Sequence, residues 1–132
     1  MNTHQTEIKV RYGETDQMGV VYHGNYAQYL EIGRLEWLEA IGIYYKEMEA
    51  NKVMLPVVSM TLKFIKSAIY GDILTVSTTL LKRPTVSIEF AYEIHNSSGE
   101  LLTTAYTKLA FVNMKSNFPM RCPQYILDEL QI

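Results

Sequence analysis

A carboxylate, two glycines and a histidine stand close together near the start of this 132-residue chain: Asp16, Gly19, His23 and Gly24, followed directly by Asn25. They lie between a predicted strand and the start of a predicted long helix, where unpaired N–H groups and the positive end of the helix dipole become available. One N–H donor aimed at a developing oxyanion lowers a barrier by about 2.7 to 4 kcal/mol. Asp16 is therefore a candidate nucleophile or general base for acyl transfer.

Each of these residues also has a simpler structural interpretation. An aspartate in a polar turn is most often a turn or capping residue, and a histidine near a helix start usually packs or hydrogen-bonds. Asn25 suits the N-cap of the helix. Gly24 would let a substrate approach the backbone closely, and Gly19 would permit the turn that brings Asp16 over the helix end. Taken alone, the residues leave both interpretations open.

Hydrophobic periodicity predicts the elements that position this segment. Residues 6–12 alternate between apolar and polar and predict a strand. Residues 25–41 have a helical period with extra apolar residues off the main stripe, which predicts a helix buried on most sides and stopped at Gly42. Residues 44–51 suggest a second short helix. From residue 54 the alternation predicts four strands, and a further short helix could close the chain.

This order of elements predicts an α+β fold. One curved antiparallel sheet of about five strands wrapped around the long helix is the economical way to bury that helix. No repeat or Pro/Gly/Ser-rich linker divides residues 1–132, so we expect a single domain. The last long strand, residues 101–114, carries apolar side chains on both faces, which suggests a second partner surface and an oligomer.

Composition excludes several classes of protein. Hydrophobic residues make up 48% and charged residues 20%, which is ordinary globular usage, and a net charge of −2 offers no broad basic field for nucleic acid or a membrane surface. No signal peptide or spanning apolar run is visible, so we expect a cytoplasmic protein without a transmembrane segment. Cys122 is the only cysteine, which excludes an intrachain disulfide and a multi-cysteine metal site and favours a passive thiol.

Two stretches resemble the signature of a known enzyme family. Residues 11–26, RYGETDQMGVVYHGNY, and residues 29–34, YLEIGR, are similar to the 4-hydroxybenzoyl-CoA thioesterase family, and most of all to its Tol-Pal-associated acyl-CoA branch. Weaker matches at residues 55–58, 70–72, 87–92 and 111–123 extend the resemblance over nearly the whole chain.

The resemblance implies a hotdog fold that hydrolyses acyl-CoA thioesters without metal or redox cofactor. It further implies a homo-oligomer, with a dimer as the minimum unit and often a tetramer. Asp16 matches the family's nucleophile or general base, and the backbone N–H at His23 matches the group that polarises the thioester carbonyl. The His23 side chain matches the Tol-Pal-associated branch, which favours a general acyl-CoA over a hydroxybenzoyl substrate. Ser67 stands where the family would have proline, and we expect only a local change in stiffness.

Further side chains are candidates for secondary roles. Tyr22 and Tyr26 could line the acyl pocket, although core packing explains them equally well. Glu31 and Arg34 are spaced for an i, i+3 ion pair, and Glu31 is the reserve catalytic carboxylate because some hotdog thioesterases carry theirs on the helix. Four basic residues could contact nucleotide phosphates but are more simply explained as a solvated charged surface: Lys82, Arg83, Lys108 and Arg121.

Three other functions remain open at this point. The acyl group could be carried by acyl-carrier protein instead of CoA, because thioesterases of that type also place His-x-Asn at this helix start, as His23-Gly24-Asn25 does. A non-catalytic module that only binds acyl-CoA would not need a carboxylate at Asp16. A hotdog hydratase would need an acid–base pair of its own, which this sequence does not show.

Overall fold

A computed structural model describes residues 3–130, which fold as strands on one side of a long helix. The strands are β1 (Thr3–Lys9), β2 (Val53–Met54), β3 (Val57–Phe64), β4 (Ile73–Leu80), β5 (Ser87–His95), β6 (Leu101–Ala110) and β7 (Val112–Asn113). The helices are α1 (Tyr26–Ala40), α2 (Tyr45–Ala50) and α3 (Gln124–Glu129), and two short 3-10 turns, η1 (Tyr12–Glu14) and η2 (His23–Asn25), precede α1.

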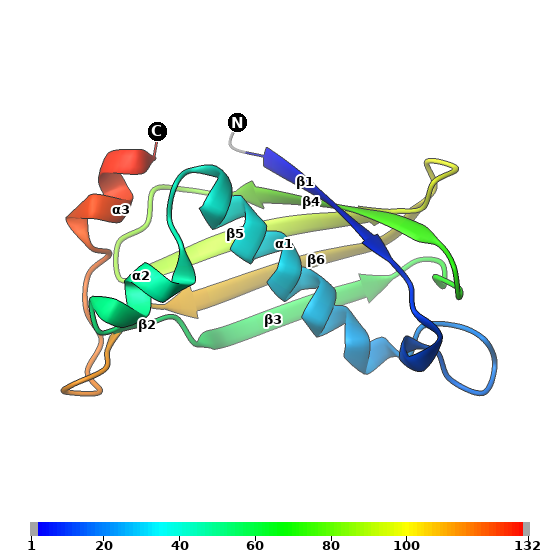
Figure 1. The fold of residues 1–132 in the computed structure, drawn as a ribbon, viewed down its shortest axis with the longest axis horizontal. Helices are drawn as coiled ribbons and strands as arrows, with labels where there is room; N and C mark the ends of the chain where they lie inside the picture. The colour runs from blue at the N-terminus through cyan, green and yellow to red at the C-terminus, as the bar shows by residue number, and fades with distance from the viewer. Residues whose placement is uncertain (1–2, 131–132) are drawn as a thin grey trace.

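The main sheet has five antiparallel strands in the order β1-β4-β5-β6-β3. Helix α1 crosses one face of this sheet at an angle, with its first turn near the Phe64 end of β3 and its last turn near α2 (Figure 1). The predicted α+β arrangement of about five strands around one long helix is therefore confirmed. The outer limits of the predicted single domain, residues 1–2 and 131–132, lie outside the described residues.

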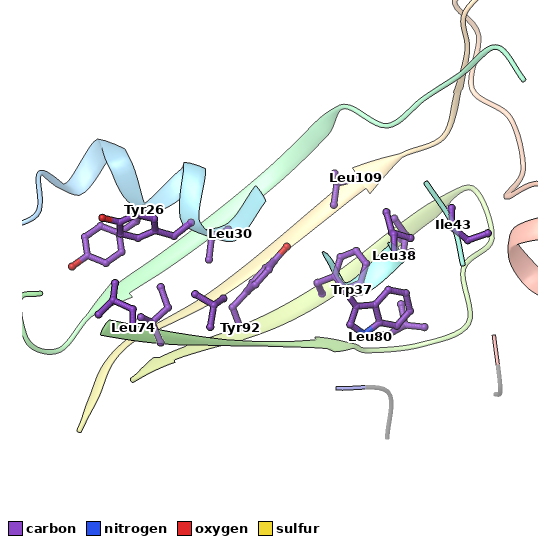
Figure 2. Close-up of a cluster of buried hydrophobic side chains, with 14 of the residues drawn as sticks. Tyr26, Leu30, Trp37, Leu38, Ile43, Leu74, Leu80, Tyr92 and Leu109 are labelled. Carbon is purple, nitrogen blue, oxygen red and sulfur yellow. The ribbon is translucent and has the colours of Figure 1, made fainter. Parts of the chain in front are cut away.

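The core lies between α1 and the sheet. Figure 2 shows Leu30, Trp37 and Leu38 of the helix facing the buried sheet residues Leu74, Leu80 and Tyr92. The inward side chains of β4 and β5 alternate with outward ones, as a strand covered on one face requires. Helix and sheet come closest at Gly33, where an added Cβ would lie 2.6 Å from Oγ1 of Thr78. This close approach fixes how α1 lies on the sheet.

Two local expectations about α1 and the first strand need correction. In this single chain only one face of α1 is buried, and Glu31, Ile32 and Glu36 on the other flank are exposed. The first strand spans Thr3–Lys9 rather than residues 6–12, because the chain turns into a 3-10 helix at Tyr12. The predicted stop is confirmed: Gly42 has φ +89°, and the N–H groups of Gly42 and Ile43 bond the carbonyls of Glu39 and Leu38 at 2.9 Å.

The exposed apolar edge of the sheet is β3. The last long strand, β6, lies between β5 and β3, so both of its edges are paired, and the partner surface predicted from its two apolar faces stays a prediction. In β3, by contrast, every residue except Leu62 is exposed, and Val58 and Phe64 are 57% and 50% exposed. The edge strand β3 is therefore a further candidate surface for a partner.

Within residues 3–130 no helix is both long and apolar enough to cross a membrane.

Candidate active site

Asp16 begins a tight turn at the tip of a small hairpin. The Asp16 N–H donates to the Val20 carbonyl at 2.8 Å, and the Gly19 N–H donates to the Asp16 carbonyl at 3.0 Å. Gly19 has φ +79°, a left-handed conformation that is favourable only for glycine. Val20 forms an isolated bridge with Ile69, which ties the hairpin to the loop before β4. The turn that Gly19 was expected to permit is therefore present, and its contact with a substrate stays a prediction.

The two oxygens of the Asp16 carboxylate have different surroundings. Oδ1 accepts hydrogen bonds from the backbone N–H groups of Met18 at 2.8 Å and Val20 at 3.4 Å. Among the described residues Oδ2 accepts none, and the Asp16 side chain is exposed. The turn thus fixes the carboxylate through one oxygen and leaves the other available to a thioester or a water molecule.

The helical segment that follows begins at His23. The 3-10 turn His23–Asn25 runs directly into α1, because the Tyr26 N–H bonds the His23 carbonyl. The first N–H groups of a helix have no acceptor within it, so those of His23 and Gly24 mark a donor end. This is the position that the sequence predicted for the oxyanion donors.

Asn25 does not cap the helix, and that prediction was wrong. Its backbone is already helical, with φ −78° and ψ −15°, and its side chain makes no capping bond. Instead, Nδ2 of Asn25 donates to the Glu14 carbonyl at 2.8 Å, and the same carbonyl accepts the Tyr22 N–H at 2.9 Å. A single carbonyl two residues before Asp16 thus holds the start of the helix to the hairpin of Asp16.

Glu14 is a residue of the candidate site that sequence reasoning missed. Its carboxylate is buried, and it accepts bonds from Arg11 N at 3.0 Å, Arg11 Nε at 3.0 Å and Tyr29 OH at 2.8 Å. Burial would raise the pKa of Glu14, but these hydrogen bonds and the Arg11 guanidinium outweigh it and hold the pKa below its ordinary value. The same contact and burial raise the pKa of the Tyr29 hydroxyl. Glu14 thereby connects the hairpin to α1 through its side chain as well as its backbone.

The rings of Tyr22 and His23 lie over the helix start. Their centroids are 4.4 Å apart, and both side chains are exposed. A Cβ on Gly24 would lie 2.6 Å from Cε2 of the Tyr22 ring. The face of Gly24 that was expected to be open is therefore covered by Tyr22, and a substrate reaching this backbone must displace a half-exposed, movable ring.

Tyr26 lies in the core rather than on the open surface around Asp16. It is 2% exposed, stacks edge-to-face on Tyr29 and Phe64, and its hydroxyl accepts the Ala68 N–H at 3.4 Å. Its role as a substrate contact stays a prediction, and its observed role is to join α1 to β3 and to the loop before β4.

Large apolar side chains are exposed on and near the hairpin of Asp16. They come from the segment between β1 and α1, from the last residue of β3 and from the loop between β3 and β4, and each is at least half exposed: Tyr12, Met18, Tyr22, Phe64, Ile65, Ile69 and Tyr70. A polar carboxylate and a helix end inside an apolar rim suit a substrate with an apolar acyl group next to a reactive carbonyl.

The other candidates lie away from Asp16. Lys108 and Arg121 belong to the end of the sheet near the start of β3, and Lys82 pairs there with Glu89 at 2.9 Å. Lys82 follows β4, whose eight residues span roughly 23 Å from the hairpin end, so it cannot contact a substrate at Asp16 of the same chain. Among residues 3–130 no three His, Cys, Asp or Glu side chains gather as a metal site.

Two further expectations concern single residues. Glu31 and Arg34 make no ion pair with one another in the described part of the chain. Cys122 is 6% exposed, and burial raises the pKa of its thiol to about 11, which agrees with a passive thiol.

Comparison with known proteins identifies the family. Residues 10–130 match the model of the thioesterase-like superfamily. YneP of Bacillus subtilis (strain 168), a candidate acyl-CoA thioesterase, is 36% identical over 121 residues, which cover 92% of this chain and 88% of that protein. The acyl-CoA thioester hydrolase YbgC of Escherichia coli O157:H7 is 28% identical over 124 residues, covering 94% and 92%.

Solved structures agree with these matches. A DHNA-CoA thioesterase from Staphylococcus aureus is 38% identical and has a TM-score of 0.92, with coverage of 97% of this chain and 86% of that one. A 4-hydroxybenzoyl CoA thioesterase has a TM-score of 0.88 over 98% and 99% of the two chains, and at 17% identity it shows the shared fold alone. The narrower resemblance to the Tol-Pal-associated branch stays a prediction. The chain belongs to the thioesterase-like superfamily and is a thioester hydrolase of the hotdog fold.

Proposed function

We propose that the protein hydrolyses acyl-CoA thioesters, with Asp16 as nucleophile or general base and the N–H groups of His23 and Gly24 as oxyanion donors. The observation that carries the proposal is the Glu14 carbonyl, which binds the hairpin of Asp16 to the helix start through Tyr22 and Asn25. The relatives named for acyl-CoA hydrolysis support the choice of carrier.

The chemistry of a carboxylate determines how much of the catalysis falls to Asp16 and how much to the N–H donors. A carboxylate is a weak base toward water, so the donors at the helix start must supply much of the rate enhancement. Each well-aimed donor contributes about 2.7 to 4 kcal/mol. Attack by Oδ2 of Asp16 would expel the CoA thiolate and leave a mixed anhydride, whereas general base catalysis would add water to the carbonyl directly.

The His23 side chain serves to orient the thioester. It is exposed beside the Tyr22 ring, and a thiolate leaves readily without a proton donor, so protonation of the leaving group is the lesser role. A single turnover in labelled water tests for the anhydride route at Asp16. Label in the Asp16 carboxylate supports the anhydride, whereas label only in the released acid is expected both from general base catalysis and from water attack on the acyl carbon of an anhydride.

A thioesterase panel tests the function itself. Short, long and aromatic acyl-CoAs are followed by release of free thiol, and matching acyl-carrier-protein thioesters are run beside them. We expect turnover of CoA thioesters at a rate at least equal to that of the carrier-protein thioesters. Faster turnover of the latter would favour that carrier, and no thiol release from any substrate would favour a binding module.

We further propose that two copies pair through β3. This edge strand is eight residues long, exposed and largely apolar, which is the kind of edge that pairs with another strand. Antiparallel pairing with its own copy is a closed, two-fold contact. It would set the Phe64 end of one β3, beside the helix start, against the Val57 end of the other. The basic residues at that far end would then come near Asp16 of the neighbouring copy.

Light scattering tests this pairing. We expect a mass of two or four times 15.2 kDa for the wild type. The double variant Val58→Asp, Met60→Asp should dissociate and lose activity, because it places like charges across the two-fold contact, while Gln5→Asp on the other edge strand should do neither. A fully active 15.2 kDa wild-type monomer contradicts the proposal.

The expected cytoplasmic location and cofactor independence stay predictions, tested by cell fractionation and by assay after dialysis against a chelator.

A further inference from the structure

One loop holds the chain on both sides of Asp16. It is the loop between β3 and β4, residues 65–72, which we call the clasp loop. Before Asp16, the Val10 N–H donates to the Asp72 carbonyl at 2.9 Å, and the Gly71 N–H donates to the Val10 carbonyl at 3.1 Å. Val10 is fully buried, so these bonds lie away from water, where a hydrogen bond is electrostatically stronger. The clasp loop therefore fixes the point at which the chain enters the hairpin.

The clasp loop also holds the chain after the hairpin turn. The Val21 N–H donates to the Ala68 carbonyl at 2.9 Å, next to the antiparallel bridge between Val20 and Ile69. The Ala68 N–H donates to the hydroxyl of Tyr26, the first residue of α1, at 3.4 Å. Ala68 is itself fully buried. A single residue of the clasp loop thus contacts both the hairpin and the start of α1, the two parts that the proposed function needs side by side.

The shape of the clasp loop depends on the side chain of Asp72. Its Oδ2 accepts the Ile69 N–H at 3.0 Å, while its own N–H donates to the Ile69 carbonyl at 3.1 Å. Gly71, inside this turn, has φ +86°. The turn fixes Ile69, which pairs with Val20, and the Asp72 carbonyl holds Val10. Asp72 therefore connects the contact before the hairpin to the contact after it.

The beginning of the clasp loop is anchored to the sheet. The N–H groups of Ile65 and Lys66 both donate to the carbonyl of Leu102 on β6, at 2.8 and 3.1 Å. The Lys66 ammonium also forms an ion pair with the Glu100 carboxylate. At its other end the loop continues directly into β4. The turn closed by Asp72 thus lies between two points fixed on the sheet, and the hairpin of Asp16 takes its position from that turn.

We infer that Asp72 is a positioning residue for thioester hydrolysis. Its carboxylate keeps the clasp loop closed on the hairpin, and the hairpin keeps Asp16 at the start of α1. The inference rests on the proposed function and adds a residue that acts without contacting the thioester. Glu14 holds the hairpin to α1 on one side, and the clasp loop holds it on the other. Opening the turn at Asp72 should therefore displace Asp16, and a displacement of about 1 Å can reduce a rate about 100-fold.

Two substitutions of Asp72 test the inference, with Asp128→Ala as the matched control. Asp128 is an exposed aspartate of α3 that also accepts one hydrogen bond, from Nε2 of Gln124 at 2.8 Å. On the best acyl-CoA of the panel we expect Asp72→Ala to lower kcat about 10- to 100-fold and to leave KM within about threefold. Asp72→Asn keeps an acceptor oxygen for the Ile69 N–H, so its kcat should stay within about threefold of the wild type. Asp128→Ala should change neither constant by more than about twofold.

A pair of glycine substitutions tests the same turn without removing a charge. Gly71 has φ +86° and Gly42, at the end of α1, has φ +89°, and an added Cβ meets no atom within 4 Å at either position. Alanine therefore brings the same backbone strain to both, and Tm should fall by similar amounts. Only Gly71 belongs to the clasp loop, so only Gly71→Ala should lower kcat, by at least about fivefold. If Asp72→Ala does not fold, this pair decides, and equal kcat in the two glycine variants overturns the inference.

Amide hydrogen exchange separates positioning from a general loss of stability. In Asp72→Ala we expect faster exchange in residues 10–21, whose end residues donate to the clasp loop, and a much smaller change in residues 87–95 of β5. An equal increase in both segments would show that the whole fold is weakened and would overturn the inference. A loss of kcat with unchanged exchange in residues 10–21 would overturn it as well.

The kinetic outcomes also distinguish this inference from the proposed function. A folded Asp72→Ala protein with kcat within about threefold of the wild type overturns the inference. A rise in KM at unchanged kcat would make Asp72 a substrate contact, and equal losses in Asp72→Ala and Asp72→Asn would assign the effect to its charge; either result overturns the inference too. Asp16→Asn with undiminished turnover defeats the proposed function, whatever the result at Asp72. An inactive Asp16→Asn beside a fully active Asp72→Ala leaves the proposed function standing and removes only the role of Asp72.

Discussion

Replacing Glu14 by alanine should weaken both the fold and the active site, although Glu14 touches no substrate. The carboxylate accepts the hydroxyl of Tyr29, a residue only 1% exposed, at 2.8 Å. Removing it leaves that buried hydroxyl without its acceptor, which costs about 1 to 3 kcal/mol. The Arg11 side chain is 77% exposed and regains water, so its bonds add little to the loss. We expect Glu14→Ala to lower the free energy of unfolding by about 2 kcal/mol and Tm by about 6 to 10 °C.

The same substitution should slow catalysis. Glu14 fixes the hairpin of Asp16 to α1, and a displacement of about 1 Å in a catalytic group can reduce rates about 100-fold. We expect kcat/KM to fall by roughly 10- to 100-fold, mainly in kcat because the acyl site is intact. Glu14→Gln, which keeps an acceptor for Tyr29, should recover part of both losses. Thermal unfolding and steady-state kinetics measure these effects.

The lowered pKa of Glu14 determines in which direction the stability of the fold should change with pH. Because the folded-state pKa lies below the ordinary value of 4.5, the contribution of the carboxylate is complete above pH 4.5 and is lost as the pH falls through the folded-state pKa. The wild type should lose more stability than Glu14→Gln as the pH is lowered from 5 to 3. Glu39→Ala, at an exposed position of α1, is the control. A Glu14→Ala protein with Tm within 2 °C and kcat/KM within threefold of the wild type would refute this reasoning.

Three shorter predictions concern single residues. Gly19→Ala should lower the free energy of unfolding by about 1 to 2 kcal/mol and reduce kcat, because φ is +79° at this position. The control Gly13→Ala, where an added Cβ meets no atom within 4 Å, should change neither Tm nor kcat. Equal effects of the two substitutions would contradict the role of the turn. Gly33→Ala should lower the free energy of unfolding, measured by urea titration, by about 1 to 3 kcal/mol, because the added Cβ would lie 2.6 Å from Oγ1 of Thr78. An unchanged urea midpoint would show that α1 can shift to accommodate the methyl group. Cys122 of the folded protein should resist a disulfide-exchange reagent at pH 8, because a thiol with a pKa of about 11 is only about 0.1% ionised at that pH. It should react once the protein unfolds. Rapid labelling of the native protein would contradict this prediction.

The elements of this fold could be predicted because their signals are local. The alternation of apolar and polar residues predicted the strands, and the 3.6-residue period of apolar residues predicted α1. Gly42 predicted the end of α1, and the structure shows a positive φ at this glycine. The turn at Asp16, shortly before the helix start at His23, followed from the order of these residues in the chain.

The features that sequence did not predict depend on contacts between distant residues. Glu14 looked like an ordinary charged residue, because its partner Tyr29 is fifteen residues away and only the folded chain buries them together. Asn25 looked like a cap, but a carbonyl eleven residues earlier takes its side chain. The exposed edge at β3 was not predicted because alternation does not reveal strand order, and β3 is placed at the edge by its pairing with β6 alone.

The most direct test of the central claim is the turnover of Asp16→Asn on the best acyl-CoA of the panel. Asparagine keeps the side-chain oxygen that accepts the Met18 N–H, so the hairpin and Tm should be preserved. The account predicts that kcat falls below one hundredth of the wild-type value, a barrier increase of at least about 2.7 kcal/mol. A folded Asp16→Asn protein that keeps more than one tenth of the wild-type kcat would contradict the assignment of Asp16 as the catalytic carboxylate.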